Sequence, residues 1–254
     1  MTDRLKENVP TGTKQLRNAA TLLVVRDAGA GMEVLMLQRP ERVGDLYSGA
    51  CVFPGGVVED SDRQAYAHCE GPDDQAASAS LRLDDNGLGY FVAAVRECFE
   101  EAGLLFAYDS AGGLLDFDRV DAATLAGLRL ALRSGETRLS EACAGRRWKL
   151  AVDRLAYHSH WLTPPGLPKR FDTRFFLAVA PAKQTVLADG QEALRHFWLT
   201  PAQALARAVE FKLRPATIST LESLTPFADA GACWQATRAL RHIEMRMPQL
   251  GASP

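Results

Sequence analysis

Three glutamates crowd into the segment RECFEEAGLL, residues 96–105: Glu97, Glu100 and Glu101. On a helix, the i, i+3 and i+4 spacing places all three on one face. Like charges at these spacings weaken an isolated helix by roughly 0.2–0.5 kcal/mol per pair. A solvated acidic face is one interpretation. The other is a site for a hard cation such as magnesium, which takes oxygen ligands and typically uses one or two carboxylates with waters and substrate phosphates.

The surrounding sequence predicts a helix. Apolar residues recur at helical spacing from Phe91 to Ala102, and Gly103 suits a helix C-terminus. On a helical wheel the glutamates lie roughly opposite this apolar stripe. Cys98 belongs to the stripe, so we expect it to face the core and to be unreactive. One face of the helix should therefore pack on a core while the other carries the carboxylates.

A glycine pair precedes this helix, in FPGGVVED, residues 53–60. Gly55 and Gly56 follow a short strand-like run, and glycine backbone can approach a ligand closely. Together with RECFEEAGL, this segment closely resembles the Nudix box. That family pattern runs Gly, five residues, Glu, seven residues, Arg-Glu-apolar-x-Glu-Glu-x-Gly-apolar. Gly56 begins the pattern here, and residues 96–104 complete it.

Two departures from the family pattern stand out. Asp62 replaces the first Glu, which keeps the charge on a shorter arm, and the chain between Asp62 and Arg96 is far longer than seven residues. Such a split box resembles one branch of the family, which includes a mammalian peroxisomal coenzyme A diphosphatase. The segments LQRPERVGDLYSGACVFPGG and HWLTPPGLPKRFDTRFFLA also resemble that branch, so the resemblance covers roughly residues 19–225.

The resemblance implies roles for the residues that match the box. The three glutamates, Glu97, Glu100 and Glu101, would ligate magnesium or manganese, and Glu97 or Glu100 would also act on the attacking water. Arg96 would position the glutamates by ion pairing, and the backbone at Gly55 or Gly56 would contact metal or substrate. The family often takes a further catalytic carboxylate from a later loop, for which Glu192 is either the match or a plain loop glutamate.

Cations in the two segments that resemble this branch are candidates for holding substrate phosphates. For each of the three cations in the second segment, the alternative is solubility together with a pair to Asp172. His158 and His160 alternate along a predicted strand, but no third ligand stands at a spacing that would suit a zinc site. The candidate substrate-binding cations are Arg39, Lys169, Arg170 and Arg174.

The predicted elements mix strands and helices without regular alternation, which indicates an α+β fold. Residues 19–27 and 33–40 read as a hairpin, and residues 104–109, 156–164, 173–181 and 195–201 as further strands. Residues 60–88 look irregular. We expect one Nudix domain over residues 1–254, a mixed sheet between helices, with an insert at about 63–88 inside the box. Helical segments are expected at 118–152 and, as a C-terminal extension, at 214–247.

Composition narrows the class of protein. The 254 residues carry a net charge of −2, which disfavours a general nucleic-acid binder, and no apolar run is long enough to span a bilayer. The N-terminus is polar without a visible secretory signal, and five scattered cysteines lack a C-x-x-C pair. We therefore expect a cytoplasmic protein with a small-molecule partner; a homodimer stays one alternative for its oligomeric state.

The resemblance implies a metal-dependent hydrolase that cleaves the diphosphate linkage of a nucleoside diphosphate joined to another group. Coenzyme A or an acyl derivative is the first candidate substrate, and ADP-ribose, a nucleotide sugar or a dinucleotide are alternatives. A Nudix domain that only binds or regulates is a further alternative, against which the complete set of Arg96 and three glutamates speaks.

Overall fold

The structure, a computed structural model, describes residues 16–29, 31–44, 47–187, 190–191 and 193–248. The strands are β1 Leu16–Ala28, β2 Gly31–Gln38, β3 Cys51–Val52, β4 Gly55–Val57, β5 Ala107–Tyr108, β6 Lys149–Leu150, β7 Ala156–Leu162, β8 Arg170–Val179, β9 Arg195–Leu199 and β10 Met245–Arg246. The helices are α1 Asp74–Leu81, α2 Gly87–Ala102, α3 Ala122–Arg133, α4 Leu139–Arg146, α5 Pro201–Ala206, α6 Pro215–Leu224 and α7 Ala230–Arg238, with 3-10 turns η1 Asp60–His68, η2 Phe117–Arg119 and η3 Val152–Arg154.

A mixed sheet forms the centre of the fold. Its order is β10-β7-β8-β1-β2-β3, with β4 pairing to β1 and β9 to β2. The predicted hairpin of β1 and β2 is confirmed, and β8 runs parallel to β1 from the pair Leu16–Arg170 to the pair Val25–Val179. Strands β5 and β6 form a separate two-stranded sheet.

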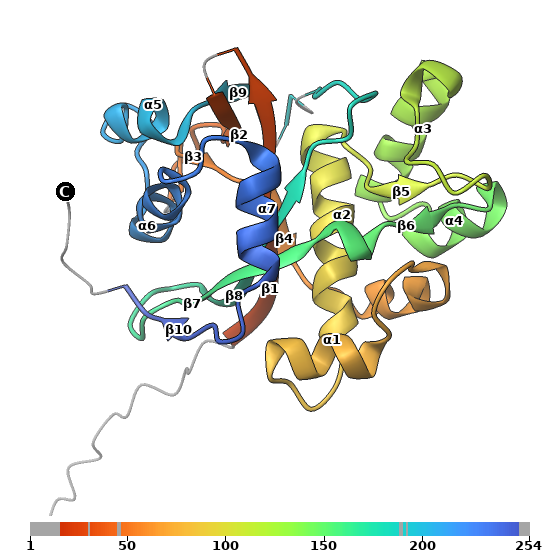
Figure 1. Cartoon of the computed structure of the whole chain (residues 1–254), viewed down its shortest axis with the longest axis horizontal. Coiled ribbons are helices and arrows are strands. Elements are labelled where there is room, and N and C mark those ends of the chain that lie inside the picture. Colours follow the sequence, from red (N-terminus) through yellow and green to blue (C-terminus); the bar gives the residue numbers. More distant parts are fainter. Residues whose placement is uncertain (1–15, 30, 45–46, 188–189, 192, 249–254) are drawn as a thin grey trace, which may run out of the picture.

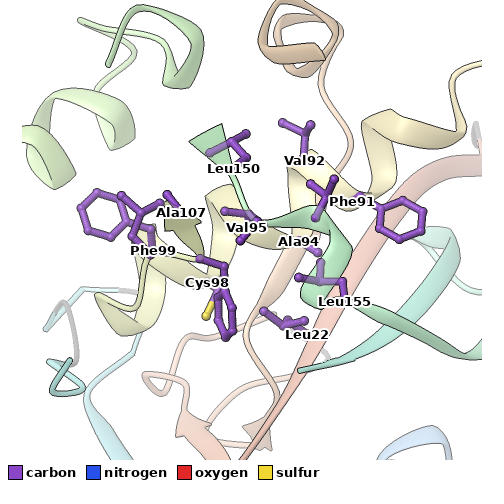
Figure 2. Packing of buried hydrophobic residues seen from close by; sticks show 14 of the residues in the cluster. Leu22, Phe91, Val92, Ala94, Val95, Cys98, Phe99, Ala107, Leu150 and Leu155 are labelled. Atoms are coloured by element: carbon purple, nitrogen blue, oxygen red, sulfur yellow. The ribbon is translucent and has the colours of Figure 1, made fainter. Parts of the chain in front are cut away.

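Helices cover both faces of the main sheet (Figure 1). On one face, α2 packs against β1 and β8, and the rings of Phe91 and Phe176 lie 4.4 Å apart. Figure 2 shows Val95 and Cys98 of α2 directed into this core near Leu22. On the other face, α5, α6 and α7 cover a second apolar cluster. The α+β class, the mixed sheet between helices and the C-terminal helices are therefore confirmed, as is the core position of Cys98.

The insert is the clearest correction to the sequence prediction. Residues 60–88 are not irregular, because they form η1 and α1 and bury Ala65, Ala77 and Leu81. They also hold the start of α2: the Asp74 carboxylate accepts from the backbone N–H of Leu88 at 2.9 Å, and the N–H of residue 86 donates to the same carboxylate. The insert is thus a packed support for the glutamate helix.

Smaller differences concern element boundaries. The segment PGG, expected as a loop, joins the sheet as β4, because Gly56 pairs with Ala20 of β1. The strand expected at 104–109 is reduced to Ala107–Tyr108. The two helices expected within 118–152 are present as α3 and α4. No helix among the described residues is long and apolar enough to cross a bilayer.

Candidate active site

Helix α2 carries the three glutamates on its C-terminal half. It ends where Gly103 adopts a left-handed conformation (φ 75°), as the glycine predicted. Glu101 is 5% exposed, and the side chains of Glu97 and Glu100 are 13% and 15% exposed. The interpretation of these glutamates as a solvated acidic face was therefore wrong. This face is largely covered by β4 and the turn after it, and desolvation makes any charge on it matter more.

The glycine pair of β4 allows the close approach of the glutamates to the sheet. The backbone N–H of Gly55 donates to Glu101 Oε2 at 3.0 Å. A Cβ atom added to Gly56 would collide with the carboxylate of Glu97, and one added to Gly55 would lie 2.5 Å from the carbonyl oxygen of Ala20. A side chain at residue 55 would therefore collide with the backbone of β1, and one at residue 56 would push the Glu97 carboxylate aside. The pair thus positions carboxylates, a role that the sequence pattern alone did not specify.

A buried ion pair holds the base of the site together. Arg96 Nε donates to Asp62 Oδ1 at 2.8 Å and Arg96 Nη2 to Asp62 Oδ2 at 3.2 Å. The same guanidinium donates to the carbonyl of Val57 at 2.8 Å and to Glu97 Oε1 at 2.9 Å, and its Nη1 lies 3.6 Å from Glu100 Oε2. The shorter arm of Asp62 therefore still reaches Arg96, and Arg96 contacts two of the glutamates.

Burial and like charges raise the proton affinity of this cluster. Burial raises the pKa of Glu100 to about 7, against the lowering effect of Arg96, while the charges of Glu97, Glu59 and Asp62 raise it further. Burial also raises the pKa of Asp62, although its hydrogen bond to Arg96 opposes that effect. One arginine does not fully compensate this many carboxylates. The cluster is therefore chemically suited to a further cation.

A metal ion would find hard oxygen donors here. Glu97 and Glu100 converge on the same nitrogen of Arg96, so both carboxylates already point to one place. In the part of the chain that the structure describes, no three carboxylate, imidazole or thiol groups are arranged closely enough to hold a metal. The donor chemistry thus fits magnesium or manganese, while the side chains are turned toward Arg96 and Gly55.

The predicted phosphate-binding cations are spread over the fold. Arg39 follows β2 directly. Its backbone N–H donates to the carbonyl of Ala50, which precedes the glycine pair in the chain. Lys169 is exposed before β8, and Arg170 Nε donates to the carbonyl of Thr163. Arg174 is 4% exposed and pairs with Asp172, as the alternative interpretation expected. The structure does not bring these four side chains together.

Glu192 lies outside the described residues. Its neighbour Gln191 accepts hydrogen bonds from Arg42 Nη2 and Arg133 Nη2, both at 3.0 Å. The same loop contacts the end of the glutamate helix, since the N–H of Leu187 donates to the carbonyl of Ala102 at 2.9 Å. The role of Glu192 stays a prediction.

Sequence reasoning missed two residues of this site. The charge of Glu59, which follows the glycine pair closely in FPGGVVED, acts on Glu100, so its acidic side chain was the available signal. Arg129 of α3 donates from Nε to the carbonyl of Glu100 at 2.8 Å and from Nη1 to the carbonyl of Leu187 at 2.6 Å. No local pattern could have linked that arginine to the glutamate helix.

Comparison with known proteins identifies the family of the chain. The sequence model of one family, the NUDT19 Nudix domain, matches residues 72–218, more than half of the chain. The chain therefore belongs to the Nudix hydrolases, within the family of the NUDT19 Nudix domain.

Several of its relatives are named acyl-coenzyme A diphosphatase NUDT19, and one from Caenorhabditis elegans is named putative nudix hydrolase 7. The acyl-coenzyme A diphosphatase NUDT19 of Xenopus laevis is 27% identical over 252 residues, covering 85% of this chain and 66% of the relative. The human protein of that name is 28% identical over 256 residues, covering 86% and 68%. The chain thus spans about two thirds of the length of these relatives. A solved structure, a NUDIX hydrolase from Alicyclobacillus acidocaldarius, is 27% identical with a TM-score of 0.72, and the match covers 88% of this chain and 97% of that one.

Proposed function

We propose that this Nudix hydrolase cleaves the diphosphate linkage of coenzyme A or an acyl derivative and depends on magnesium or manganese. The observation that carries the proposal is the convergence of Glu97 and Glu100 on Arg96 beside the Gly55–Gly56 strand. The names of the relatives support the substrate class.

The metal would be held by Glu97, Glu100 and Glu101. When bound, it would offset phosphate charge and lower the pKa of water. Binding at these glutamates requires the carboxylates to turn away from Arg96 and from the N–H of Gly55, to which they now bond. The other contacts of Arg96, its buried pair with Asp62 and its hydrogen bond to the carbonyl of Val57, would keep the helix, the η1 turn and β4 in place while they do so.

The chain's own residues supply the base and the geometry. Glu97 would accept a proton from the attacking water, and the contact of its carboxylate with Gly56, which has no side chain, supports this role. Before a metal binds, Arg96 holds Glu97 at this position through a 2.9 Å hydrogen bond. Phosphoryl chemistry of this kind depends mainly on positioning and electrostatics, which a rigid set of carboxylates and cations can provide.

Substrate choice rests on features outside the box. The segment containing Lys169 and Arg170, beside Phe171, offers cations and an aromatic ring for a phosphorylated purine. ADP-ribose, nucleotide sugars and dinucleotides carry the same diphosphate and are the alternatives.

Product identification tests the proposal. Incubation of the chain with coenzyme A and magnesium should yield 3′,5′-adenosine bisphosphate and 4′-phosphopantetheine, resolved by liquid chromatography and mass spectrometry. Glu100→Gln should lose most of this activity. Cleavage of ADP-ribose or a dinucleotide without cleavage of coenzyme A would overturn the substrate and leave the hydrolase class intact.

A further inference from the structure

A groove of about 960 Å³ lies at the end of α2 opposite to the glutamates. It is lined by residues of α1, β7, β8 and the C-terminal segment 237–245. Figure 1 shows α1, β7 and β10 together at the lower end of the molecule, while α2 continues upward from there. None of the box glutamates lines this groove.

Among the charged side chains that line the groove, cations outnumber carboxylates. In the described part of the chain, the carboxylates of the lining are those of Asp153 and Glu244. Asp153 already accepts from the hydroxyl of Tyr108 at 2.8 Å, and Glu244 lies 3.6 Å from His242. The cationic or imidazole side chains of the lining are Arg82, Arg174, Arg238, Arg241, His160 and His242.

Arg174 gives the groove a buried donor. Its side chain is 4% exposed, and its Nε has no hydrogen-bond partner in the described part of the chain. Asp172 binds Nη1 of this arginine but also bonds to His160 Nε2 at 2.6 Å, so one carboxylate serves two groups. A buried donor of a charged group that lacks an acceptor calls for a ligand acceptor.

Arg82 provides a second indication. Its guanidinium contacts Nδ1 of His242 across the groove, and it forms no ion pair with the residues described. The charge of Arg82 is therefore available to a ligand anion in the groove, which would accept hydrogen bonds from its guanidinium. Phe91 and Tyr157 line the same groove and offer apolar ring surface beside the arginines.

The core separates this groove from the glutamates. Gly56, Ala20, Arg174 and His160 form one row of paired residues across β4, β1, β8 and β7. Gly56 and Arg174 are two strand spacings apart, about 10 Å. Ala20 lies between them in β1 and is 0% exposed, and Tyr90 of α2, whose ring lies 5.0 Å from the Arg174 guanidinium, is 1% exposed. A ligand of the groove therefore does not reach the glutamates through the interior.

We propose that this groove binds a phosphate monoester attached to a planar group, as a site separate from the glutamates. Guanidinium groups match phosphate oxygens in geometry and stack on rings, which an ammonium or imidazole alone does not do as well. This inference does not depend on the proposed substrate of the hydrolase.

Two matched variants make the test sharp. Arg82 and Arg147 are both arginines in the left-handed conformation, with φ of 57° and 55°, at the ends of the eight-residue helices α1 and α4. Glycine suits this conformation better than arginine, so neither Arg82→Gly nor Arg147→Gly should destabilise the fold. Only Arg82 lines the groove.

The measurement is calorimetric titration of the full chain with AMP in the presence of EDTA. Without metal, the charges of Glu97, Glu100 and Glu101 repel phosphate, so AMP should not bind at the glutamates. We expect AMP to bind wild type, Arg147→Gly and Glu100→Gln alike, and Arg82→Gly at least roughly tenfold more weakly. Inorganic phosphate should bind more weakly than AMP, and adenosine should not bind. A second variant, Arg241→Ser, should also weaken the binding of AMP.

Three results would overturn the proposal. The first is absence of AMP binding to the wild type. The second is equal affinity in Arg82→Gly and Arg147→Gly. The third is loss of AMP binding in Glu100→Gln while Arg82→Gly keeps it, which would place the nucleotide at the glutamates.

Discussion

Replacing Glu100 by Gln should stabilise the metal-free protein at neutral and higher pH. The pKa of Glu100 is raised from its ordinary value of 4.5 to about 7, mainly by burial. In the unfolded chain this carboxyl ionises near pH 4.5, whereas in the folded chain it ionises only near pH 7. Its charge therefore opposes folding. The opposition is absent below pH 4.5, grows as pH rises, and is fully present above pH 7.

The size of the effect follows from the shift. At 1.36 kcal/mol per pKa unit, moving from 4.5 to about 7 corresponds to about 3 kcal/mol as an upper bound. At roughly 2–4 °C per kcal/mol for a chain of this length, Glu100→Gln should raise the metal-free Tm by about 6–12 °C at pH 8. The difference should vanish at pH 4. Glu222→Gln, an exposed glutamate of α6, is the control and should change little at either pH.

Metal should reduce the difference in stability between the two proteins. A ligand present at a hundred times its Kd stabilises the folded state by about 2.7 kcal/mol, so magnesium should raise the Tm of the wild type. Glu100→Gln should gain much less, because it lacks one proposed ligand. Thermal unfolding at pH 8 with EDTA and with magnesium measures both effects. An equal magnesium-induced gain in both proteins, or a metal-free variant less stable than the wild type, would refute the reasoning.

Three further predictions follow from the same contacts. Gly56→Ala should displace Glu97 and lower kcat at least tenfold in steady-state kinetics. The control is Gly145→Ala, whose added Cβ meets nothing within 4 Å and which should leave kcat unchanged. Equal kcat in the two variants would contradict the positioning role of Gly56. Asp62→Asn should cost about 3–5 kcal/mol in denaturant unfolding, because it removes the charge of the fully buried carboxylate that pairs with the buried Arg96. A loss below 1 kcal/mol would show that this pair is not structural. Replacing residues 63–86 by a short linker should destabilise the whole fold in circular dichroism, since Asp74 would no longer hold the start of α2; a cooperative, native-like melt would contradict that role.

Much of the site was predictable because its signal is local. The spacing of Glu97, Glu100 and Glu101 and the helix that carries them depend on residues within a few turns of each other. The β1–β2 hairpin and the ending at Gly103 follow from short-range turn and capping preferences for the same reason. These parts of the prediction were confirmed.

The errors arise where contacts are distant in sequence. The insert looked like a surface loop because its composition is polar. The side chains of Asp74 and Ser78, however, accept hydrogen bonds from backbone N–H groups at the start of α2. The glutamates looked exposed because a helical wheel shows one helix alone and cannot show that β4 covers the second face. Arg174 was expected to act beside Lys169, but the register of β8 pairs it with Ala20 and His160, so Arg174 lines the groove and Lys169 does not. The predicted cytoplasmic location, single domain and homodimer stay predictions.

The most direct test of the central claim is the initial rate of coenzyme A hydrolysis against magnesium concentration, in the wild type and in Glu100→Gln. We expect the wild type to show a saturable magnesium dependence and to release 3′,5′-adenosine bisphosphate. Glu100→Gln should lose most of this turnover at every magnesium concentration while remaining folded. Near wild-type rates in Glu100→Gln at limiting magnesium would contradict the assignment of the metal and the reaction to this helix face.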